Sequence, residues 1–164
     1  MSETVVLETT KGNIEITLNR AKAPVTVDNF IKYVKEGFFD GTVFHRVIPG
    51  FMIQGGGFTS AGTQKKTHQP IHLESKNGLK NTKGTIAMAR TNDPDSATSQ
   101  FFINLIDNSF LNASLGNQGY AVFGVVTSGM EAVDAIAIAK TVTRGPHGDW
   151  PKEDIVIKSA YMKG

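Results

Sequence analysis

Short apolar runs with a two-residue period recur along this chain of 164 residues and limit it to folds built mainly from strands. The first two runs form one alternating pattern, broken at residues 11–13 as in the turn of an antiparallel hairpin. Their inward-facing positions are Val5, Leu7, Thr9, Ile14, Ile16 and Leu18. Further runs of strand length, most of them bounded by turn-forming residues, are VFHRVI, FMIQ, PIHLE, TIAMAR, QFFINL, YAVFGVV and DIVIKSAYM.

Two segments have the longer period of a helix instead. The first begins at Pro24, which suits an opening turn, and ends before Gly37. In the second, Ser128 and Glu131 have the spacing of a capping box. The residues predicted to face the core are Val27, Phe30, Ile31 and Val34 in the first helix, and Val133 with Ile136 or Ala137 in the second.

Eight or nine strands and two helices, without regular alternation of strand and helix, predict a mainly antiparallel sheet. Such a sheet would close into a barrel or fold as a sandwich, and the helices would cover its open ends. Neither an internal repeat nor a low-complexity linker divides the chain. We therefore expect one domain over residues 1–164.

The formal net charge of +2 is too small to indicate nucleic-acid binding by itself. The most basic stretch, Thr63–Gly84, contains five lysines and one glutamate, which gives a local charge of +4. No Phe, Trp or Tyr lies among these lysines for bases to stack on. The favoured interpretation is a solvated loop, and an RNA-binding surface is the alternative.

The absence of cysteine excludes disulfides, thiolate chemistry and cysteine-based zinc sites. The first ten residues enter a strand pattern directly and do not form a signal peptide, and no stretch of about 18 apolar residues could span a membrane. We therefore expect a cytoplasmic protein without membrane contact. Nothing in the pattern suggests an oligomer, so a monomer is expected.

Histidines give no convincing metal motif. The stretch His68–His72 has the histidine spacing of a zinc-protease helix, but Gln69 replaces the necessary glutamate and Pro70 breaks the helix. His45 and His147 have no acidic cluster near them in sequence, so packing or surface roles are favoured over metal binding.

Nucleotide and nucleophile motifs are equally weak. The glycine run at residues 55–57 is not followed by the lysine of a phosphate-binding loop, and it favours a sharp bend or a close backbone contact. Ser99 has no adjacent candidate base. The sequence predicts no metal, nucleotide or organic cofactor.

Arg46 and Gln54 stand out because they interrupt the nearly apolar stretch FHRVIPGFMIQGGG. Burying either side chain without a partner would cost several kcal/mol. Strand alternation places Arg46 on one face with Phe44 and Ile48, and Gln54 on one face with Met52. If these faces adjoin, the guanidinium and the amide border an apolar patch. Alternatively, Arg46 extends from a barrel surface into solvent or is held by a buried carboxylate.

The longer strings around these residues resemble the cyclophilin family of peptidyl-prolyl cis-trans isomerases. The strings are NFIKYVKEGFFDGTVFHRVIPGFMIQGGGF, NGLKNTKGTIAMARTNDPDSATSQFFIN and YAVFGVVTSGMEAVD. The similarity runs nearly from end to end, and SATSQFFIN is similar to prokaryotic members. The resemblance implies a closed eight-stranded antiparallel β-barrel capped by two α-helices, in agreement with the pattern above.

The resemblance also implies roles for individual residues. Arg46 corresponds to the catalytic arginine of the family. The residues implied to line a pocket for the proline ring are Phe51, Met52, Phe102 and Leu111. Those implied to hydrogen-bond the substrate backbone are Gln54 and Gln100, and those implied to flank an extended substrate are Ala89, Arg90 and Thr91.

Two further residues of the implied substrate site depart from the eukaryotic pattern. Phe110 stands where those members usually have Trp, and Tyr120 stands where they usually have His. The loss of an indole N–H at Phe110 implies weak affinity for cyclosporin-type inhibitors. Tyr120 keeps a hydrogen-bonding hydroxyl.

The implied reaction suits an arginine in an apolar pocket. Rotation about an X-Pro bond has a barrier of about 18 to 20 kcal/mol because it breaks amide resonance. The twisted imide nitrogen gains a localised lone pair, to which a fixed guanidinium would donate. The implied partners are proline-containing polypeptides and unfolded client proteins. The competing hypothesis is a proline-peptide docking module or chaperone in which isomerisation is incidental.

Overall fold

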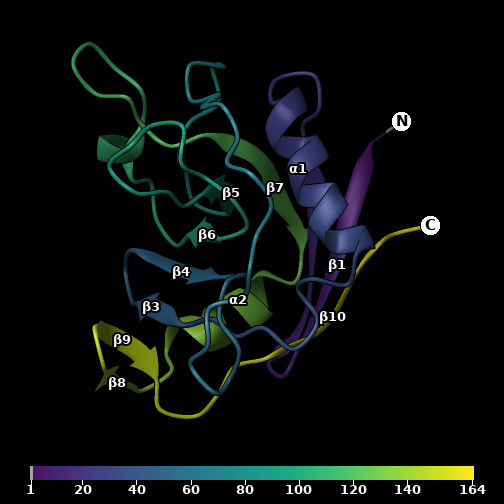
Figure 1. The fold of residues 1–164 in the computed structure, drawn as a ribbon, viewed down its shortest axis with the longest axis vertical. Helices are drawn as coiled ribbons and strands as arrows, with labels where there is room; N and C mark the ends of the chain where they lie inside the picture. The colour runs from purple at the N-terminus through teal and green to yellow at the C-terminus, as the bar shows by residue number, and fades with distance from the viewer. Residues whose placement is uncertain (1) are drawn as a thin grey trace.

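The computed structural model describes residues 2–164, which form ten β-strands, two α-helices and one 3-10 helix (Figure 1). The strands are β1 Glu3–Thr9, β2 Gly12–Leu18, β3 Arg46–Ile48, β4 Met52–Gly55, β5 Thr85–Met88, β6 Phe101–Asn104, β7 Val122–Ser128, β8 Thr141–Arg144, β9 His147–Pro151 and β10 Ile157–Met162. The helices are α1 Pro24–Lys35, the 3-10 helix Ser109–Leu111 and α2 Met130–Ala137.

Eight strands form one antiparallel sheet in the order β10-β1-β2-β7-β5-β6-β4-β3. The predicted hairpin is confirmed, because β1 and β2 pair from Glu3 with Leu18 to Thr9 with Gly12 and bury the expected face. The segment PIHLE forms only one bridge, between Ile71 and Ala97. In this segment a backbone N–H is bonded by a side chain rather than by a neighbouring strand: Leu73 N–H donates to the Asp95 carboxylate.

The sheet is strongly curled but open, so the prediction of a closed barrel is not confirmed. Its two edges are β3 and β10, and no ladder joins them within residues 2–164. The segments that precede these edges do meet: Val43 forms a bridge with Val156, and Phe44 N–H donates to the Ile155 carbonyl at 3.0 Å. The first residue of β10 also takes part, since Ile157 N–H donates to the Thr42 carbonyl and Gly41 N–H donates to the Ile157 carbonyl, each at 2.8 Å.

Helix α1 forms where the sequence predicts it and buries the expected stripe, and Gly37 follows it with a left-handed φ of 70°. Helix α2 also forms, but its predicted capping box is wrong. Ser128 is the last residue of β7, where it pairs with Glu15, and the N-cap is Gly129. A Cβ at position 129 would lie 2.1 Å from the Asn13 carbonyl oxygen, so this close approach requires glycine.

The sheet has apolar residues on both faces, in two separate clusters. Alternate residues of β4 and β6, including Ile53 and Ile103, belong to the main core, which α1 covers. The residues between them, including Met52 and Phe102, belong to a second cluster on the opposite face, together with Leu111. This second face is available for a binding site because neither α-helix contributes residues to its cluster.

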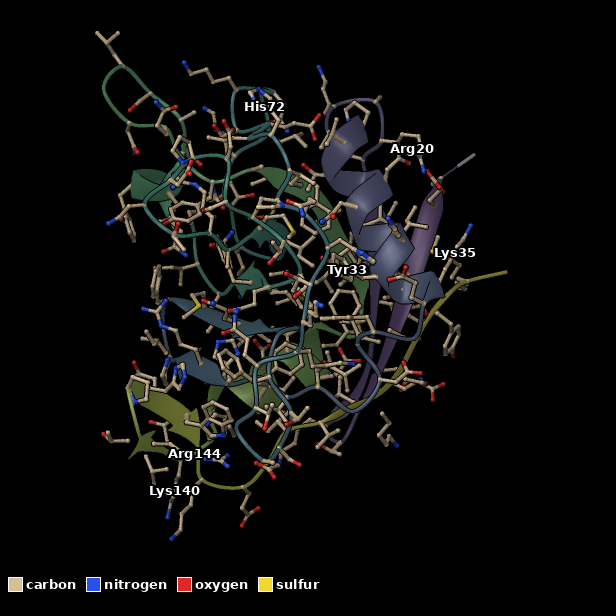
Figure 2. All side chains as sticks on the ribbon, in the orientation of Figure 1. Arg20, Tyr33, Lys35, His72, Lys140 and Arg144 are labelled. Atoms are coloured by element: carbon tan, nitrogen blue, oxygen red, sulfur yellow. The ribbon has the colours of Figure 1, made fainter. Side chains whose placement is uncertain are left out.

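A separate hairpin of β8 and β9 lies beside β3 (Figure 1). Arg144 lies on this hairpin (Figure 2). Its guanidinium is 4.6 Å from the centroid of the Trp150 ring. No helix in the described part of the chain is long and apolar enough to cross a membrane.

Candidate active site

A row of side chains crosses four strands on the second face of the sheet. Arg46 of β3 pairs with Gln54 of β4, Gln54 pairs with Phe102 of β6, and Phe102 pairs with Ala87 of β5. The predicted adjacency of the arginine and the glutamine is therefore confirmed. Phe44 was predicted to share the face of Arg46, but it lies in the main core, because regular strand geometry begins only at Arg46.

A cavity of about 110 Å³ lies over this row. Nine of the twelve residues predicted for the site line it: Arg46, Phe51, Met52, Gln54, Ala89, Arg90, Phe102, Leu111 and Tyr120. Met52, Phe102 and Leu111 are buried and give the cavity an apolar floor, whereas Arg46 is exposed at its wall. The site thus combines an apolar floor with an exposed cation at its wall.

A short polar chain runs along the wall of the cavity. The Arg46 Nη1 atom donates to Gln54 Oε1 at 3.4 Å, and Gln54 Nε2 donates to Gln100 Oε1 at 3.0 Å. Among residues 2–164, Arg46 forms no ion pair, so it is not held by a buried carboxylate. The long bond to Gln54 leaves most of the guanidinium donors free for another acceptor.

The other three predicted residues lie beside the cavity rather than in its lining. Gln100 reaches the site through Gln54, and it fits only because residue 57 is glycine, where a Cβ would lie 2.6 Å from Gln100 Cγ. Thr91 is turned toward its own loop, where its backbone N–H and hydroxyl bond Ser96. Phe110 is 65% exposed and stacks on the pocket residue Phe51, with ring centroids 5.7 Å apart. Weak cyclosporin binding stays a prediction.

Arg90, which follows β5, and Tyr120 line the cavity as one packed unit. The Arg90 guanidinium lies 4.5 Å from the Tyr120 ring centroid and donates to the Thr91 and Gly119 carbonyls at 2.8 and 2.7 Å. The Tyr120 ring in turn meets the Phe102 ring edge-on at 5.7 Å. Arg90 therefore holds Tyr120 against the floor of the cavity.

A buried asparagine network, which sequence reasoning missed, supports the other side of the pocket. Asn108 donates to the Phe51 carbonyl at 2.9 Å and to Asn104 Oδ1 at 2.8 Å. Asn104 donates to Asn81 Oδ1, and Asn81 donates to the Leu111 carbonyl, each at 3.1 Å. The only sequence signal was a polar residue, Asn104, in the otherwise apolar run FFINL.

His45, directly before Arg46, is a packing residue and not a ligand. It is only 3% exposed, and its ring lies 4.6 Å from Phe58 and 5.8 Å from both Trp150 and His147. Burial, reinforced by the electrostatic influence of the neighbouring His147 and Arg46, lowers the pKa of His45 to about 4. The imidazole is therefore neutral at physiological pH.

No group of three or more potential ligands that could hold a metal ion occurs among the described histidines and carboxylates. His68 bonds Glu36 at 2.7 Å, whereas His72 lies 3.2 Å from Asp95, so the two histidines of the HQPIH stretch have different partners. The expected helix break at this stretch is confirmed, since residues 68–72 contain no helix.

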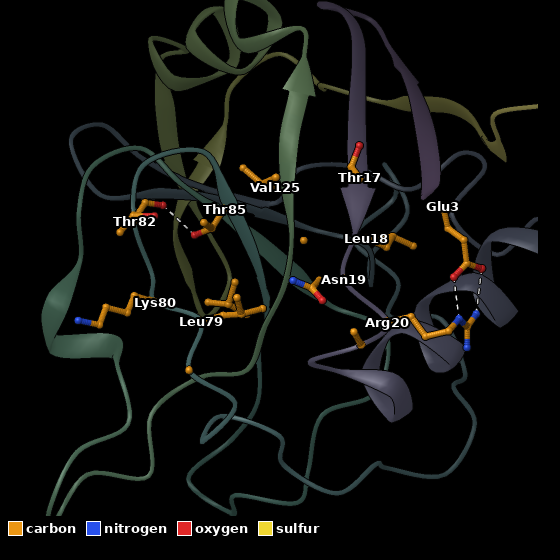
Figure 3. Close-up of a pocket in the computed structure, with 14 residues that line it drawn as sticks. Glu3, Thr17, Leu18, Asn19, Arg20, Leu79, Lys80, Thr82, Thr85 and Val125 are labelled. Carbon is orange, nitrogen blue, oxygen red and sulfur yellow. Dashed lines mark hydrogen bonds and ion pairs between the residues drawn. The ribbon is translucent and has the colours of Figure 1, made fainter. Parts of the chain in front are cut away.

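A larger hollow of about 490 Å³ lies over β2 and β7 (Figure 3). Of its charged lining residues, Arg20 is already paired with Glu3, through two bonds of 2.6 and 2.9 Å, and with Asp28. The Thr85 hydroxyl in its wall donates to the Thr82 carbonyl at 2.7 Å. None of the predicted site residues lines this hollow, so we assign the site to the smaller cavity beside Arg46.

Comparison with known proteins is consistent with this geometry. The family model described as cyclophilin-type peptidyl-prolyl cis-trans isomerase/CLD matches residues 4–162. Peptidyl-prolyl cis-trans isomerase A of Dickeya dadantii is 55% identical over 158 residues, covering 96% of this chain and 83% of that protein. Peptidyl-prolyl cis-trans isomerase B of Escherichia coli is 54% identical over 161 residues, covering 96% and 98% of the two chains.

Solved structures share the fold. A cyclophilin-type isomerase of Cryptosporidium parvum superposes with a TM-score of 0.85 at 26% identity and covers 100% of this chain and 99% of its own. A second structure of that protein, determined in the presence of the dipeptide Ala-Pro, has a TM-score of 0.83 at 27% identity, with coverage of 98% and 99%. The chain with this curled sheet and this arginine-walled pocket belongs to the cyclophilin family of peptidyl-prolyl cis-trans isomerases.

Proposed function

We propose that residues 1–164 act as one isomerase domain on X-Pro bonds of unfolded client proteins, with Arg46 as the catalytic donor. The observation that carries this proposal is the position of Arg46 and its hydrogen bonding. Its guanidinium lies at the wall of an apolar cavity, and within residues 2–164 its one side-chain hydrogen bond is the 3.4 Å bond to Gln54. A charged donor with unused N–H groups beside a dry pocket is suited to bind a group that becomes basic only during reaction.

The reaction requires no bond to be cleaved, so it requires no nucleophile. As the X-Pro bond twists, the proline nitrogen loses conjugation and becomes a hydrogen-bond acceptor. Donation from Arg46 then stabilises the twisted state more than either planar isomer. The apolar floor of Met52, Phe102 and Leu111 would receive the proline ring and exclude water, which strengthens the hydrogen bond.

The side-chain amides beside Arg46 would hydrogen-bond the substrate backbone. Gln54 and Gln100 are bonded to each other, and each retains hydrogen-bonding capacity for an extended peptide. The Cryptosporidium relative, whose structure was determined in the presence of Ala-Pro, supports proline-containing peptides as the substrate class. Docking without isomerisation is the competing function, and a peptide that binds but is not accelerated would favour it.

The test is the cis-to-trans exchange rate of an Ala-Pro peptide, measured by NMR with wild type, Arg46→Ala and Arg46→Lys. Arg46→Ala should lose about 1.5 to 3 kcal/mol of transition-state stabilisation, roughly a ten- to hundredfold fall in kcat/KM. Arg46→Lys should retain part of the rate, because lysine keeps the charge without the rigid fork.

Arg20→Ala is the matched control, since Arg20 pairs with Glu3 and Asp28 outside the cavity. It should keep the wild-type rate. Near-normal kcat/KM in an Arg46→Ala protein that circular dichroism shows to be folded would refute the assignment of Arg46.

A further inference from the structure

The proposed substrate cavity is lined by two arginines and by no acidic residue. Arg46 lies on β3 and Arg90 follows β5, with β6 and β4 between these strands in the sheet. Among residues 2–164 neither arginine forms an ion pair with a carboxylate. The whole chain carries a formal charge of only +2. The positive charge at this cavity is therefore a local feature and does not reflect an overall basic protein.

Arg90 is held in a fixed position, but its charge is not neutralised. Its two hydrogen-bond partners are the neutral carbonyls of Thr91 and Gly119, and its third contact is the face of the Tyr120 ring. These contacts orient the guanidinium without cancelling its charge. A guanidinium has five N–H donors, so the two carbonyl bonds leave donors on the Nη atoms for an acceptor in the groove.

The acidic residues closest to Arg90 in sequence are already engaged. Asp93 accepts a bond from Asp95 N–H at 2.9 Å, and Asp95 accepts from Leu73 N–H at 2.9 Å and lies 3.2 Å from His72. Neither carboxylate lines the cavity. An acidic side chain of a bound peptide would thus meet Arg90 without competition from an acid in the cavity lining.

We propose that Arg90 is a specificity-determining residue that makes the site prefer substrates with Asp or Glu beside the proline. This inference rests on the proposed function, because it takes the cavity to be where the peptide binds. It names the substrate class: acidic, proline-containing segments of polypeptide. Tyr120 and the two carbonyls fix the planar guanidinium, so little side-chain entropy is lost when an acid binds it.

The test compares peptides that differ only in one residue flanking the proline, which is Glu, Gln or Lys and is placed either before or after it. The cis-to-trans exchange rate is measured by NMR. An assay coupled to a protease would add the protease's own preference for charged residues. Wild type should isomerise the Glu peptide about three- to tenfold faster than the Lys peptide in kcat/KM, with the effect on one side of the proline. The ratio should shrink as salt is raised from about 10 mM to about 500 mM.

Two variants at position 90 separate charge from packing. Arg90→Gln removes the charge and should abolish the Glu-to-Lys ratio, whereas Arg90→Lys keeps the charge and should preserve a ratio above one. Because each ratio compares two peptides on the same protein, a general loss of activity in a variant cancels. Lys66→Gln removes a positive charge from an exposed residue that does not line the cavity, and it should leave the ratio unchanged.

Equal rates for the Glu and Lys peptides with wild type at low salt would overturn the proposal. A ratio that persists in Arg90→Gln would also overturn it, because the preference would then come from another residue. Should Arg90→Gln fail to fold, a Glu-to-Lys ratio of wild type that is independent of salt would refute the proposal. If wild type accelerates no peptide, including the neutral Gln peptide, the proposed function fails instead.

Discussion

Three consecutive residues, His45 directly before β3 and the first two residues of that strand, occupy three different environments. His45 is enclosed by aromatic rings, Arg46 faces the cavity, and Val47 is part of the main core. The two buried neighbours fix the backbone on both sides of the arginine. The guanidinium is therefore presented by a rigid strand rather than by a loop, which suits a group that must be aimed at one atom.

The shifted pKa of His45 makes stability depend on pH. Its pKa is about 4 in the folded protein, against the ordinary value of 6.5 that applies to the unfolded chain. Between these values the unfolded chain takes up a proton that the folded protein excludes. Stability should therefore fall as pH drops from about 6.5 to about 4, by about 3 kcal/mol for this group. Urea unfolding at about pH 7 and about pH 4.5 would measure the fall.

His45→Gln should reduce this pH dependence, because glutamine does not titrate. His68→Gln is the control, since His68 is exposed and bonded to Glu36 at the surface. If the urea midpoint of His45→Gln shifts between about pH 7 and about pH 4.5 by as much as that of wild type, burial of His45 is not the cause of the acid sensitivity.

At the scale of elements, helix α1 depends for its N-terminal cap on Glu74, which lies 48 positions after Thr26 of its first turn. The N-cap residue, Ala23, has no side-chain acceptor. The Glu74 carboxylate takes its place, accepting bonds from Val25 N–H at 3.2 Å, from Thr26 N–H at 2.7 Å and from the Thr26 hydroxyl at 2.6 Å. A negative group here also interacts favourably with the helix dipole. The irregular segment that contains Glu74 thus completes α1.

Glu74→Ala should lower the free energy of unfolding by about 1 to 2 kcal/mol, because it leaves two backbone N–H groups and the Thr26 hydroxyl without their acceptor. Glu74→Gln should lose less, since its amide keeps one acceptor oxygen. Glu153→Ala, at an exposed position outside this contact, should lie within about 0.5 kcal/mol of wild type in the same denaturation experiment. A loss no larger than that of the control would show that water caps α1 equally well.

For the whole molecule, local patterns in the sequence predicted the parts that depend on neighbouring residues. The hairpin of β1 and β2, the stripe of α1 and the outward faces of Arg46 and Gln54 all follow from periods of two or 3.6 residues. Most residues of the site came from resemblance to the cyclophilins, and the cavity brings nine of them together.

The features that were missed or wrong depend on contacts distant in sequence. The open edge between β3 and β10 depends on how far the sheet curls, which no local pattern reports. Ser128 does not cap α2 because it ends β7 in a pairing with Glu15, and residue 129 is glycine because Asn13, more than a hundred residues earlier, leaves no space for a side chain. The asparagine network likewise joins residues from separate elements.

The two faces of the sheet should respond separately to substitution, and adjacent residues of β4 test this. Ile53 is fully buried in the main core, whereas Gln54 contacts Arg46 and Gln100 at the cavity. Ile53→Val should cost about 0.5 to 1.5 kcal/mol of stability and leave kcat/KM unchanged. Gln54→Leu should lower kcat/KM about five- to thirtyfold with a smaller loss of stability. Urea denaturation would measure the stability of both variants, and NMR exchange would measure their kcat/KM. If each variant lost both stability and kcat/KM to the same extent, the two faces would be coupled.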